Sequence, residues 1–223
     1  MNIDILIRTN RKSISISISP QGELIIKAPR RCSLEYIQTV IAKKEDWINL
    51  HRQRVLENQN LNKSIFNHED ILFCGQVYHV VFDNKIKHIT LENEYCIVPQ
   101  KYSDDLEKNL IKWYKKVAAP ILWGRVEYFS NLMQLSPNKV RLSNARGCWG
   151  SCNSLGLVSL NWRLIMVPHD LIDYVVVHEL AHLVQMNHSQ LFWGVVKSVL
   201  PDFAVRRKAL KKGDYLLSLY RNN

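Results

Sequence analysis

Alternating polar and apolar residues near the start of the chain predict a small sheet. Serine alternates with isoleucine across residues 13–19, the period of two that turns one face of a strand towards a core. A Pro-Gln-Gly turn at residues 20–22 leads into a second apolar segment at residues 23–28. We therefore expect these two segments to form a hairpin.

The next patterns predict a helix followed by short strands. Ser33 can cap a helix that runs past Trp47 towards Leu56, and residues 60–67 are polar enough for a connection. Strands are expected in four short apolar segments, at residues 71–74, 77–82, 87–91 and 95–98.

A change of composition at residues 99–104 indicates a domain boundary. We expect a β-rich amino-terminal region with one long helix at residues 1–102, and a second domain at residues 103–223. The second domain opens with a helical pattern over residues 104–132, which Pro120 should kink or split.

Two strands should pair ahead of a further helix, at residues 139–142 and 157–165. Pro168 and Asp170 suit the start of that helix, whose apolar positions continue to residue 184. The mixture of strand and helix patterns predicts an α+β fold.

This last helix carries the motif His-Glu-Leu-Ala-His at residues 178–182. Residues four apart share one face of a helix, so His178 and His182 can direct two imidazoles at one metal ion. Glu179 can reach a metal-bound water without coordinating the metal. The alternative is a structural helix face with hydrogen-bonded histidines and a solvated glutamate. The apolar surroundings favour the metal site, because a bare buried carboxylate would be costly.

A catalytic zinc needs a third protein ligand. Glu179 is the last glutamate in the chain, and His188 is the only histidine after His182. His188 is therefore the predicted third ligand. We expect the helix to end near Met186, with Asn187 turning the chain back towards the metal.

The spacing from His182 to His188 equals that of the metzincin pattern. Gln185 stands at the metzincin glycine position, however, and no methionine follows His188, so membership of that group is not expected. Instead, Ser189 should cap a new helix that runs to Pro201.

The chain resembles a known family, the YgjP-like predicted metal-dependent hydrolases, which are zincins related to the WLM and SprT-like groups. The matching motifs lie at residues 148–152, 160–164, 173–182, 187–189 and 192–193. Matches in type and order at residues 8–29, 44–47 and 75–78 extend the resemblance over nearly the whole chain. One departure is the mostly apolar stretch at residues 183–186, where the family often has a longer polar one.

The resemblance implies that His178, His182 and His188 bind the metal and that Glu179 is the catalytic base. It implies no substrate, because some members carry a peptidase label and others a nucleotide pyrophosphatase label. We predict a zinc-dependent metallohydrolase (Zn²⁺), with a metallopeptidase favoured, in which Glu179 activates a zinc-bound water against a peptide bond.

Two alternatives stay open. One is a nucleotide pyrophosphatase-type hydrolase with the same metal and base. The other is a non-catalytic module that binds nucleic acid or protein around a structural zinc, although such a site should have four protein ligands and the sequence offers no obvious fourth.

Several other residues are candidates for supporting roles around the metal. Candidate donors to a developing oxyanion are Arg146, Arg163, Tyr174 and Tyr215, and their spacing does not select among them. Candidates for orienting the imidazoles are Asp173 and Asn161.

Two tryptophans and one predicted strand near the motif could form the walls of the site. Trp149 and Trp193 could line the pocket wall, but aromatic residues near a zinc helix more often pack in the core. The segment at residues 157–162 is a candidate edge strand for pairing with a substrate backbone, and the alternative is a fully paired interior strand.

Net charge is +10, from 30 Lys and Arg against 20 Asp and Glu. Such an excess usually covers solvated helices, and the alternative is attraction to nucleic acid or nucleotide phosphates. No helix-turn-helix, zinc-finger or P-loop pattern accompanies it, so sequence-specific DNA reading is not expected. A peptide or protein substrate is the expected partner, and the sequence does not indicate the oligomeric state.

The five cysteines form an odd set that fits a reducing compartment. Cys148 and Cys152 are poorly spaced for a second metal site and favour ordinary packing. No apolar run reaches the length of a membrane span, and the first residues lack a signal-like apolar stretch. We therefore expect a cytoplasmic protein without membrane association.

Overall fold

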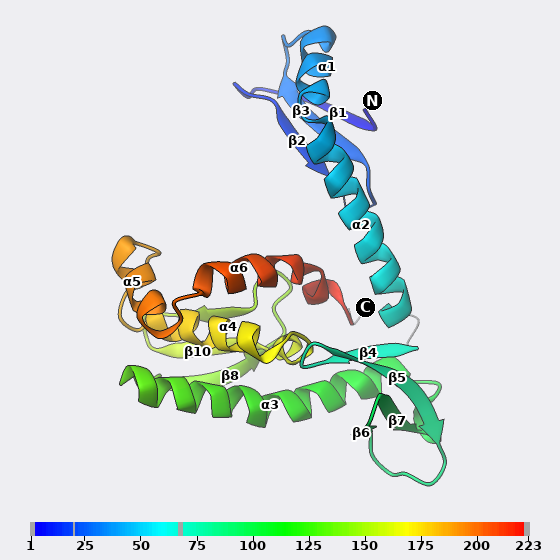
Figure 1. The fold of residues 1–223 in the computed structure, drawn as a ribbon, viewed down its shortest axis with the longest axis vertical. Helices are drawn as coiled ribbons and strands as arrows, with labels where there is room; N and C mark the ends of the chain where they lie inside the picture. Colours follow the sequence, from blue (N-terminus) through cyan, green and yellow to red (C-terminus); the bar gives the residue numbers. More distant parts are fainter. Residues whose placement is uncertain (1–2, 20, 67–68, 221–223) are drawn as a thin grey trace. The chain divides into compact units, whose positions relative to one another are not determined.

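The computed structural model describes residues 3–19, 21–66 and 69–220. It contains both helices and sheets, which confirms the predicted α+β class (Figure 1). The chain divides into two compact units, Met1–Ser64 and Ile65–Asn223. This division differs from the predicted boundary after residue 102, because the strands between residues 70 and 99 share a core with the helices that follow them.

The first unit is a three-stranded sheet with helices. Its strands are β1 (Ile5–Thr9), β2 (Ser15–Ile18) and β3 (Leu24–Pro29). The central strand β3 runs antiparallel to β2, which confirms the predicted hairpin, and parallel to β1. Alternate residues of β3 pack with isoleucines of the helices in a small core of Leu24, Ile26, Ala28, Ile37, Ile41 and Ile48.

Two helices replace the single helix predicted here, α1 (Leu34–Ala42) and α2 (Glu45–Phe66). Ser33 caps α1 as predicted, since its Oγ accepts a hydrogen bond from the backbone N–H of Tyr36. The polar connection predicted at residues 60–67 is wrong for residues 60–66, which continue α2, and residue 67 lies outside the described residues. No glycine or proline interrupts this polar segment, so its composition does not end the helix.

The second unit begins with a four-stranded sheet. Its strands are β4 (Asp70–Phe73), β5 (Gln76–Asp83), β6 (Thr90–Glu92) and β7 (Tyr95–Pro99), in the order β4-β5-β7-β6. All four predicted strands are present, although β6 is shorter than expected. The turn between β4 and β5 is tied to a later part of the same unit, because Cys74 and Gly75 donate backbone hydrogen bonds to the carbonyls of Ile165 and Met166.

After a short 3-10 helix, η1 (Gln100–Tyr102), comes the long helix α3 (Leu106–Met133). It continues through Pro120, so the predicted split does not occur. A proline removes one helical hydrogen bond, but buried apolar residues one turn apart hold both halves of α3 on the core, at Leu110, Tyr114, Ala118, Leu122 and Val126.

A second small sheet supports the site, with strands β8 (Lys139–Ser143), β9 (Gly150–Cys152) and β10 (Leu157–Asn161). The predicted pairing of β8 with β10 is confirmed, but β10 ends at Asn161, and η2 (Trp162–Met166) is a 3-10 helix rather than more strand. Asn161 causes this ending, because its side chain accepts the N–H of Arg163 and caps η2. In the order β8-β10-β9, β10 is paired on both sides. The predicted edge strand at residues 157–162 is therefore wrong, and β9 lies at the edge.

Helix α4 (His169–Ala181) begins directly after Pro168, as predicted, and is surrounded by the rest of the unit. It contacts α3, α5 (Gln190–Val199), α6 (Phe203–Lys212) and both β9 and β10 (Figure 1). The last element, η3 (Asp214–Ser218), leads to a buried end at Leu219 and Tyr220. α4 is thus the central helix of this unit, and its apolar residues 175–177, 180 and 181 are all buried.

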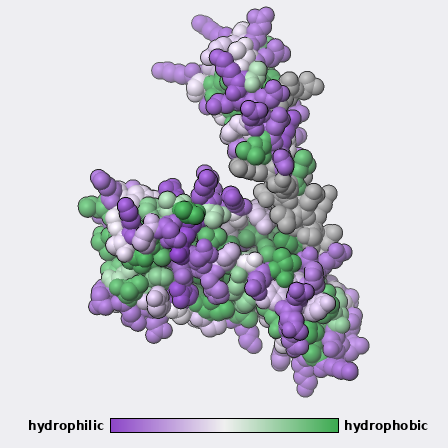
Figure 2. Space-filling model, in the orientation of Figure 1, coloured by the Kyte–Doolittle hydropathy of each residue, from purple (hydrophilic) through white to green (hydrophobic). Residues whose placement is uncertain are grey.

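Hydrophilic residues cover much of the face of each unit seen in Figure 2, as expected for the basic composition. Among the described residues, none of the helices is both long and apolar enough to span a bilayer.

Candidate metal centre

Three histidines converge at the end of α4. His178 lies in the last turn of α4, His182 follows at its C-cap, and His188 lies in the loop before α5. Their ring nitrogens lie within 4.8 Å of one another, and the Nε2 atoms of His178 and His188 are 3.0 Å apart. The structure thus brings together the three residues that the sequence predicts as metal ligands.

The chemistry of this donor set fits a metal ion such as zinc. Two nitrogens bound to one tetrahedral zinc lie roughly 3.3 Å apart, close to the observed separation of His178 and His188. Burial and, to a smaller extent, the charges of His182, His188 and Arg207 together lower the pKa of His178 to about 3. His178 is therefore a neutral imidazole, which is the form that binds metals.

The chain returns to His178 and His182 by a different route from the one predicted. α4 ends at Ala181 rather than near Met186, and the chain then turns through residues 183–185. Asn187 is not in the left-handed conformation that we expected. Its Oδ1 instead accepts the backbone N–H of Ser189 at 3.1 Å, and Ser189 caps α5 as predicted.

The early end of α4 also places a backbone acceptor beside one imidazole. The carbonyl of Gln185 lies 3.2 Å from Nδ1 of His182, which leaves the other nitrogen for the metal. The predicted orienting roles of Asp173 and Asn161 are wrong. Asp173 pairs with Arg125 at 2.6 Å, and Asn161 donates to the carbonyls of residues 145 and 148. A backbone carbonyl carries no sequence signal, so the role of Gln185 was missed.

Aromatic rings from α5 wall the three imidazoles. Phe192 is fully buried, and its ring centre lies 4.9, 4.6 and 4.8 Å from those of His178, His182 and His188. Trp193 stacks on His188 at 5.6 Å, as expected for a wall residue. Phe192 was not predicted to take part, although its position one turn beyond His188 on the capped helix is a signal that could have found it.

Glu179 lies beside the histidines in an apolar setting. It is 5% exposed, its Oε2 has no hydrogen-bond partner among the described residues, and burial raises its pKa to about 8. The backbone of β9 lies directly against it, because a Cβ added to Gly150 would be 2.7 Å from both Cγ and Oε1 of Glu179. A buried carboxyl in this state needs either a proton or a positive charge nearby.

Cavities open on both sides of the histidines. A cavity of about 250 Å³ next to Glu179 is lined by Cys148, Trp149, Gly150, Tyr174, Val175, His178, Glu179 and Leu210. Trp149 lines it while its Nε1 donates to Asp214 at 2.8 Å. On the side of His182, a cavity of about 520 Å³ is lined by parts of residues 134–138, 153–156 and 182–186.

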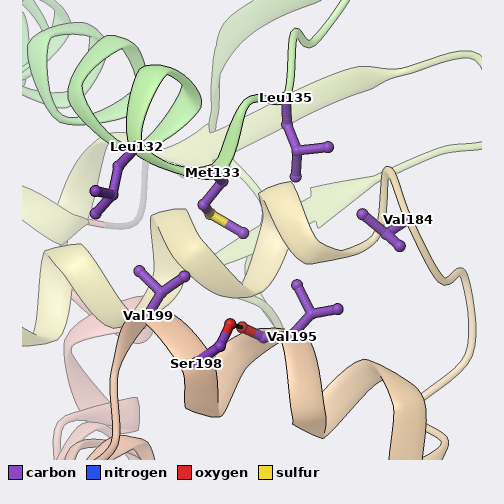
Figure 3. Close-up of a pocket in the computed structure, with 7 residues that line it drawn as sticks. All are labelled: Leu132, Met133, Leu135, Val184, Val195, Ser198 and Val199. Atoms are coloured by element: carbon purple, nitrogen blue, oxygen red, sulfur yellow. Dashed lines mark hydrogen bonds between the residues drawn. The ribbon is translucent and has the colours of Figure 1, made fainter.

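An apolar hollow of about 600 Å³ adjoins the cavity beside His182. Leu135 and Val184 line both. Figure 3 shows the hollow between the end of α3, the chain after α4, and α5, and its remaining lining residues are Leu132, Met133, Val195, Ser198 and Val199.

The candidate oxyanion donors differ in position. Arg163 is buried, and its guanidinium donates to Asn144 and to the carbonyls of Leu219 and Tyr220, so it holds the segment after η3 in place. Tyr174, one turn before His178 on α4, lines the cavity next to Glu179. Burial is the main cause of its raised pKa, which keeps its hydroxyl protonated at neutral pH.

The family model described as "YgjP-like, metallopeptidase domain" matches residues 12–213 of the chain. No curated protein matches. Among solved structures, the chain is similar to that described as "Crystal structure of the metallopeptidase zymogen of Pyrococcus abyssi abylysin", with 20% identity and a TM-score of 0.38. That match covers 45% of this chain and 97% of the other.

Gly150→Ala should destabilise the protein by about 1–3 kcal/mol, because the added Cβ would overlap the Glu179 side chain in a packed interior. Chemical denaturation measures this change. Gly147→Ala is the matched control, since a Cβ there meets no atom within 4 Å and should change the stability by less than about 1 kcal/mol. Equal effects of the two substitutions would contradict the close approach of β9 to Glu179.

Glu179→Gln should change the pH dependence of stability in metal-free protein. The carboxyl titrates near pH 4.5 when unfolded and near pH 8 when folded, so its protonated form contributes stability below pH 4.5 that is lost as pH rises to 8. The stability of wild type relative to Glu179→Gln should therefore fall by about 3–5 kcal/mol across that window. Denaturant titrations at several pH values measure the free energy of unfolding of both proteins. If the two free energies depend on pH in the same way, Glu179 is not a buried, unpaired carboxyl.

Proposed function

Because this chain belongs to the YgjP-like metallopeptidase family, we propose that it is a zinc-dependent peptidase in which His178, His182 and His188 hold the metal and Glu179 is the catalytic base. The observation that carries this proposal is the convergence of three imidazoles within 4.8 Å, beside a buried carboxylate with an unpartnered oxygen. Three imidazoles suit zinc among the common divalent ions.

A divalent metal ion bound by these histidines supplies two effects, a lowered pKa of coordinated water and polarisation of a substrate carbonyl. The protein supplies the proton transfers. Glu179 takes the proton of the attacking water at its unpartnered Oε2 and later returns it to the leaving amine. Gly150 fixes the position of the carboxylate, because the β9 backbone leaves it no room to retreat.

Strand β9 provides a surface for an extended substrate. Among the described residues it pairs with β10 alone, which leaves its other edge for backbone hydrogen bonds with a substrate. Since Gly150 of β9 contacts Glu179, a peptide pairing along this edge would pass next to the base and the histidines. We propose that the substrate backbone adds to β9, in place of the role predicted for residues 157–162.

Among the four predicted oxyanion donors, Tyr174 is supported best. Its ring lines the cavity that holds His178 and Glu179, and its raised pKa keeps a proton on the hydroxyl to donate. Arg163 is already engaged in the hydrogen bonds that hold the end of the chain. We therefore assign the stabilisation of the developing oxyanion to Tyr174.

The alternatives have less support. The binding-module hypothesis needs a structural zinc with four protein ligands, and the described residues offer a group of three histidines. Hydrolysis of nucleotides, attraction of nucleic acid and a cytoplasmic location stay predictions. So does the assignment of residues 103–223 as the catalytic domain, although all four proposed site residues lie within it.

The metal and peptidase assignments can be tested together. Wild type and Glu179→Gln should each bind about one zinc per chain by elemental analysis, and His188→Ala much less, since it lacks one of three ligands. Wild type should cleave a random library of quenched fluorescent peptides, lose this activity to a chelator and regain it with zinc. Glu179→Gln should be slower by roughly 10²–10⁴-fold, because it lacks the base.

Circular dichroism of each variant controls for folding. Full zinc retention by His188→Ala would contradict the ligand assignment, and unchanged turnover by Glu179→Gln would contradict the base. Cleavage of nucleoside triphosphates but of no peptide would replace the peptidase proposal with the nucleotide alternative.

Tyr174→Phe should lower kcat by roughly 10²-fold, because it removes a hydrogen-bond donor to the transition state and leaves the shape of the ring. KM and zinc content should stay near wild type. Tyr215→Phe is the control, because it removes the hydroxyl of another tyrosine that the sequence predicts as a donor. The assignment is wrong if kcat responds to Tyr215→Phe and not to Tyr174→Phe.

A further inference from the structure

One cation of α6 lies at the border of the metal centre. The guanidinium carbon of Arg207 is 4.9 Å from the ring centre of Trp193. That ring in turn lies 5.6 Å from the ring of His188 and 5.7 Å from that of His178. Leu210, three residues further along α6 and so on the same side of the helix, lines the cavity next to Glu179. Arg207 and two of the histidines thus lie next to the same aromatic ring.

The guanidinium of Arg207 is free to bind a ligand. The residue is exposed, and within the described part of the chain it takes part in no hydrogen bond or ion pair. Its neighbour Arg206 differs, because it pairs with Asp202 and donates to the carbonyl of Asp170. Stacking on an indole holds a guanidinium in place while leaving its N–H groups available at the edge.

The cavity beside Glu179 lies close to Arg207. Leu210, one turn further along α6, lines this cavity, and so does His178, whose ring lies 5.7 Å from the Trp193 ring that Arg207 contacts. An anionic group of a substrate in this cavity would therefore be attracted to the guanidinium.

We propose that Arg207 binds a carboxylate of the substrate and so selects peptides with an acidic group close to the cleaved bond. This inference rests on the proposed peptidase function. Arginine suits the task because its planar fork matches a carboxylate with two parallel hydrogen bonds. The carboxylate belongs either to an Asp or Glu side chain or to the carboxyl terminus of the peptide, and the chemistry at Arg207 is the same for both.

The test compares cleavage of one random peptide library made with free and with amidated carboxyl termini, with cleavage sites read by mass spectrometry. Wild type should enrich Asp and Glu at one position near the cleaved bond, or should prefer the free terminus. Arg207→Gln should lose the preference, with kcat/KM for acidic peptides lowered roughly tenfold, which corresponds to about 1.4 kcal/mol. Arg207→Glu should favour Lys and Arg at the same position.

Lys208→Glu is the matched control, because it makes the same charge reversal at the adjacent exposed residue and should leave the preference unchanged. Zinc content and circular dichroism of each variant should equal those of wild type. The effect should lie mainly in KM, since Arg207 is not assigned to the chemical step.

Three outcomes would overturn the proposal. Cleavage by wild type without any acidic preference would remove Arg207 from specificity and leave the peptidase function intact. An unchanged preference in Arg207→Glu, or the same change in Lys208→Glu, would show that this guanidinium does not select the substrate. Failure of wild type with bound zinc to cleave any peptide would overturn the peptidase function itself, and the inference with it.

Discussion

The burial of Glu179 is the constraint on which the rest of the site depends. A carboxylate in an apolar interior without a partner is unfavourable by several kcal/mol, and it is tolerated only where the surrounding packing enforces it. Here α4 is held on several sides by α3, α5, α6 and the β9–β10 pair, so it cannot rotate Glu179 towards water. The contact with Gly150 closes the remaining side.

The end of α4 converts this buried helix into a site. If the helix continued to Met186, as its apolar pattern indicates, the backbone of residue 185 would stay in the helix and His188 would lie further from His178. Ending at Ala181 instead frees the Gln185 carbonyl to orient His182 and lets the chain return with His188. One local event therefore supplies both the third imidazole and the orientation of the second.

The sequence alone was sufficient to predict the features of the site that depend on the spacing of residues along a helix. The four-residue interval of His178 and His182 and the lack of any later glutamate led to the same three histidines that the structure brings together. The caps Ser33 and Ser189 were also predicted correctly, because capping depends only on the residues at the start of a helix.

Sheet order could not be obtained in this way. The residues of β9, Gly-Ser-Cys, have no alternating apolar pattern, so the sequence does not predict this three-residue strand and leaves open whether β10 lies at the edge or in the interior of its sheet. The orienting carbonyl of Gln185 belongs to the backbone and leaves no residue signature. Arg207 belongs to a run of cationic residues whose pattern predicts a solvated helix face. Only its contact with Trp193 distinguishes it from its neighbours.

The residues proposed for the reaction come from a local sequence motif, whereas the residues that could select a substrate are brought together by tertiary packing. The histidines and Glu179 come from one helix and the loop after it, and in the proposed mechanism they would act on any peptide bond placed beside them. The proposed pairing of a substrate along β9 would recognise only the backbone, because the hydrogen bonds of a strand do not depend on side chains. Selectivity must therefore come from the walls, and these are built by α3, α5 and α6, which place an apolar hollow on the side of His182 and a stacked guanidinium beside Trp193. A chain that kept the metal motif but exchanged these helices would retain the reaction and change its substrates.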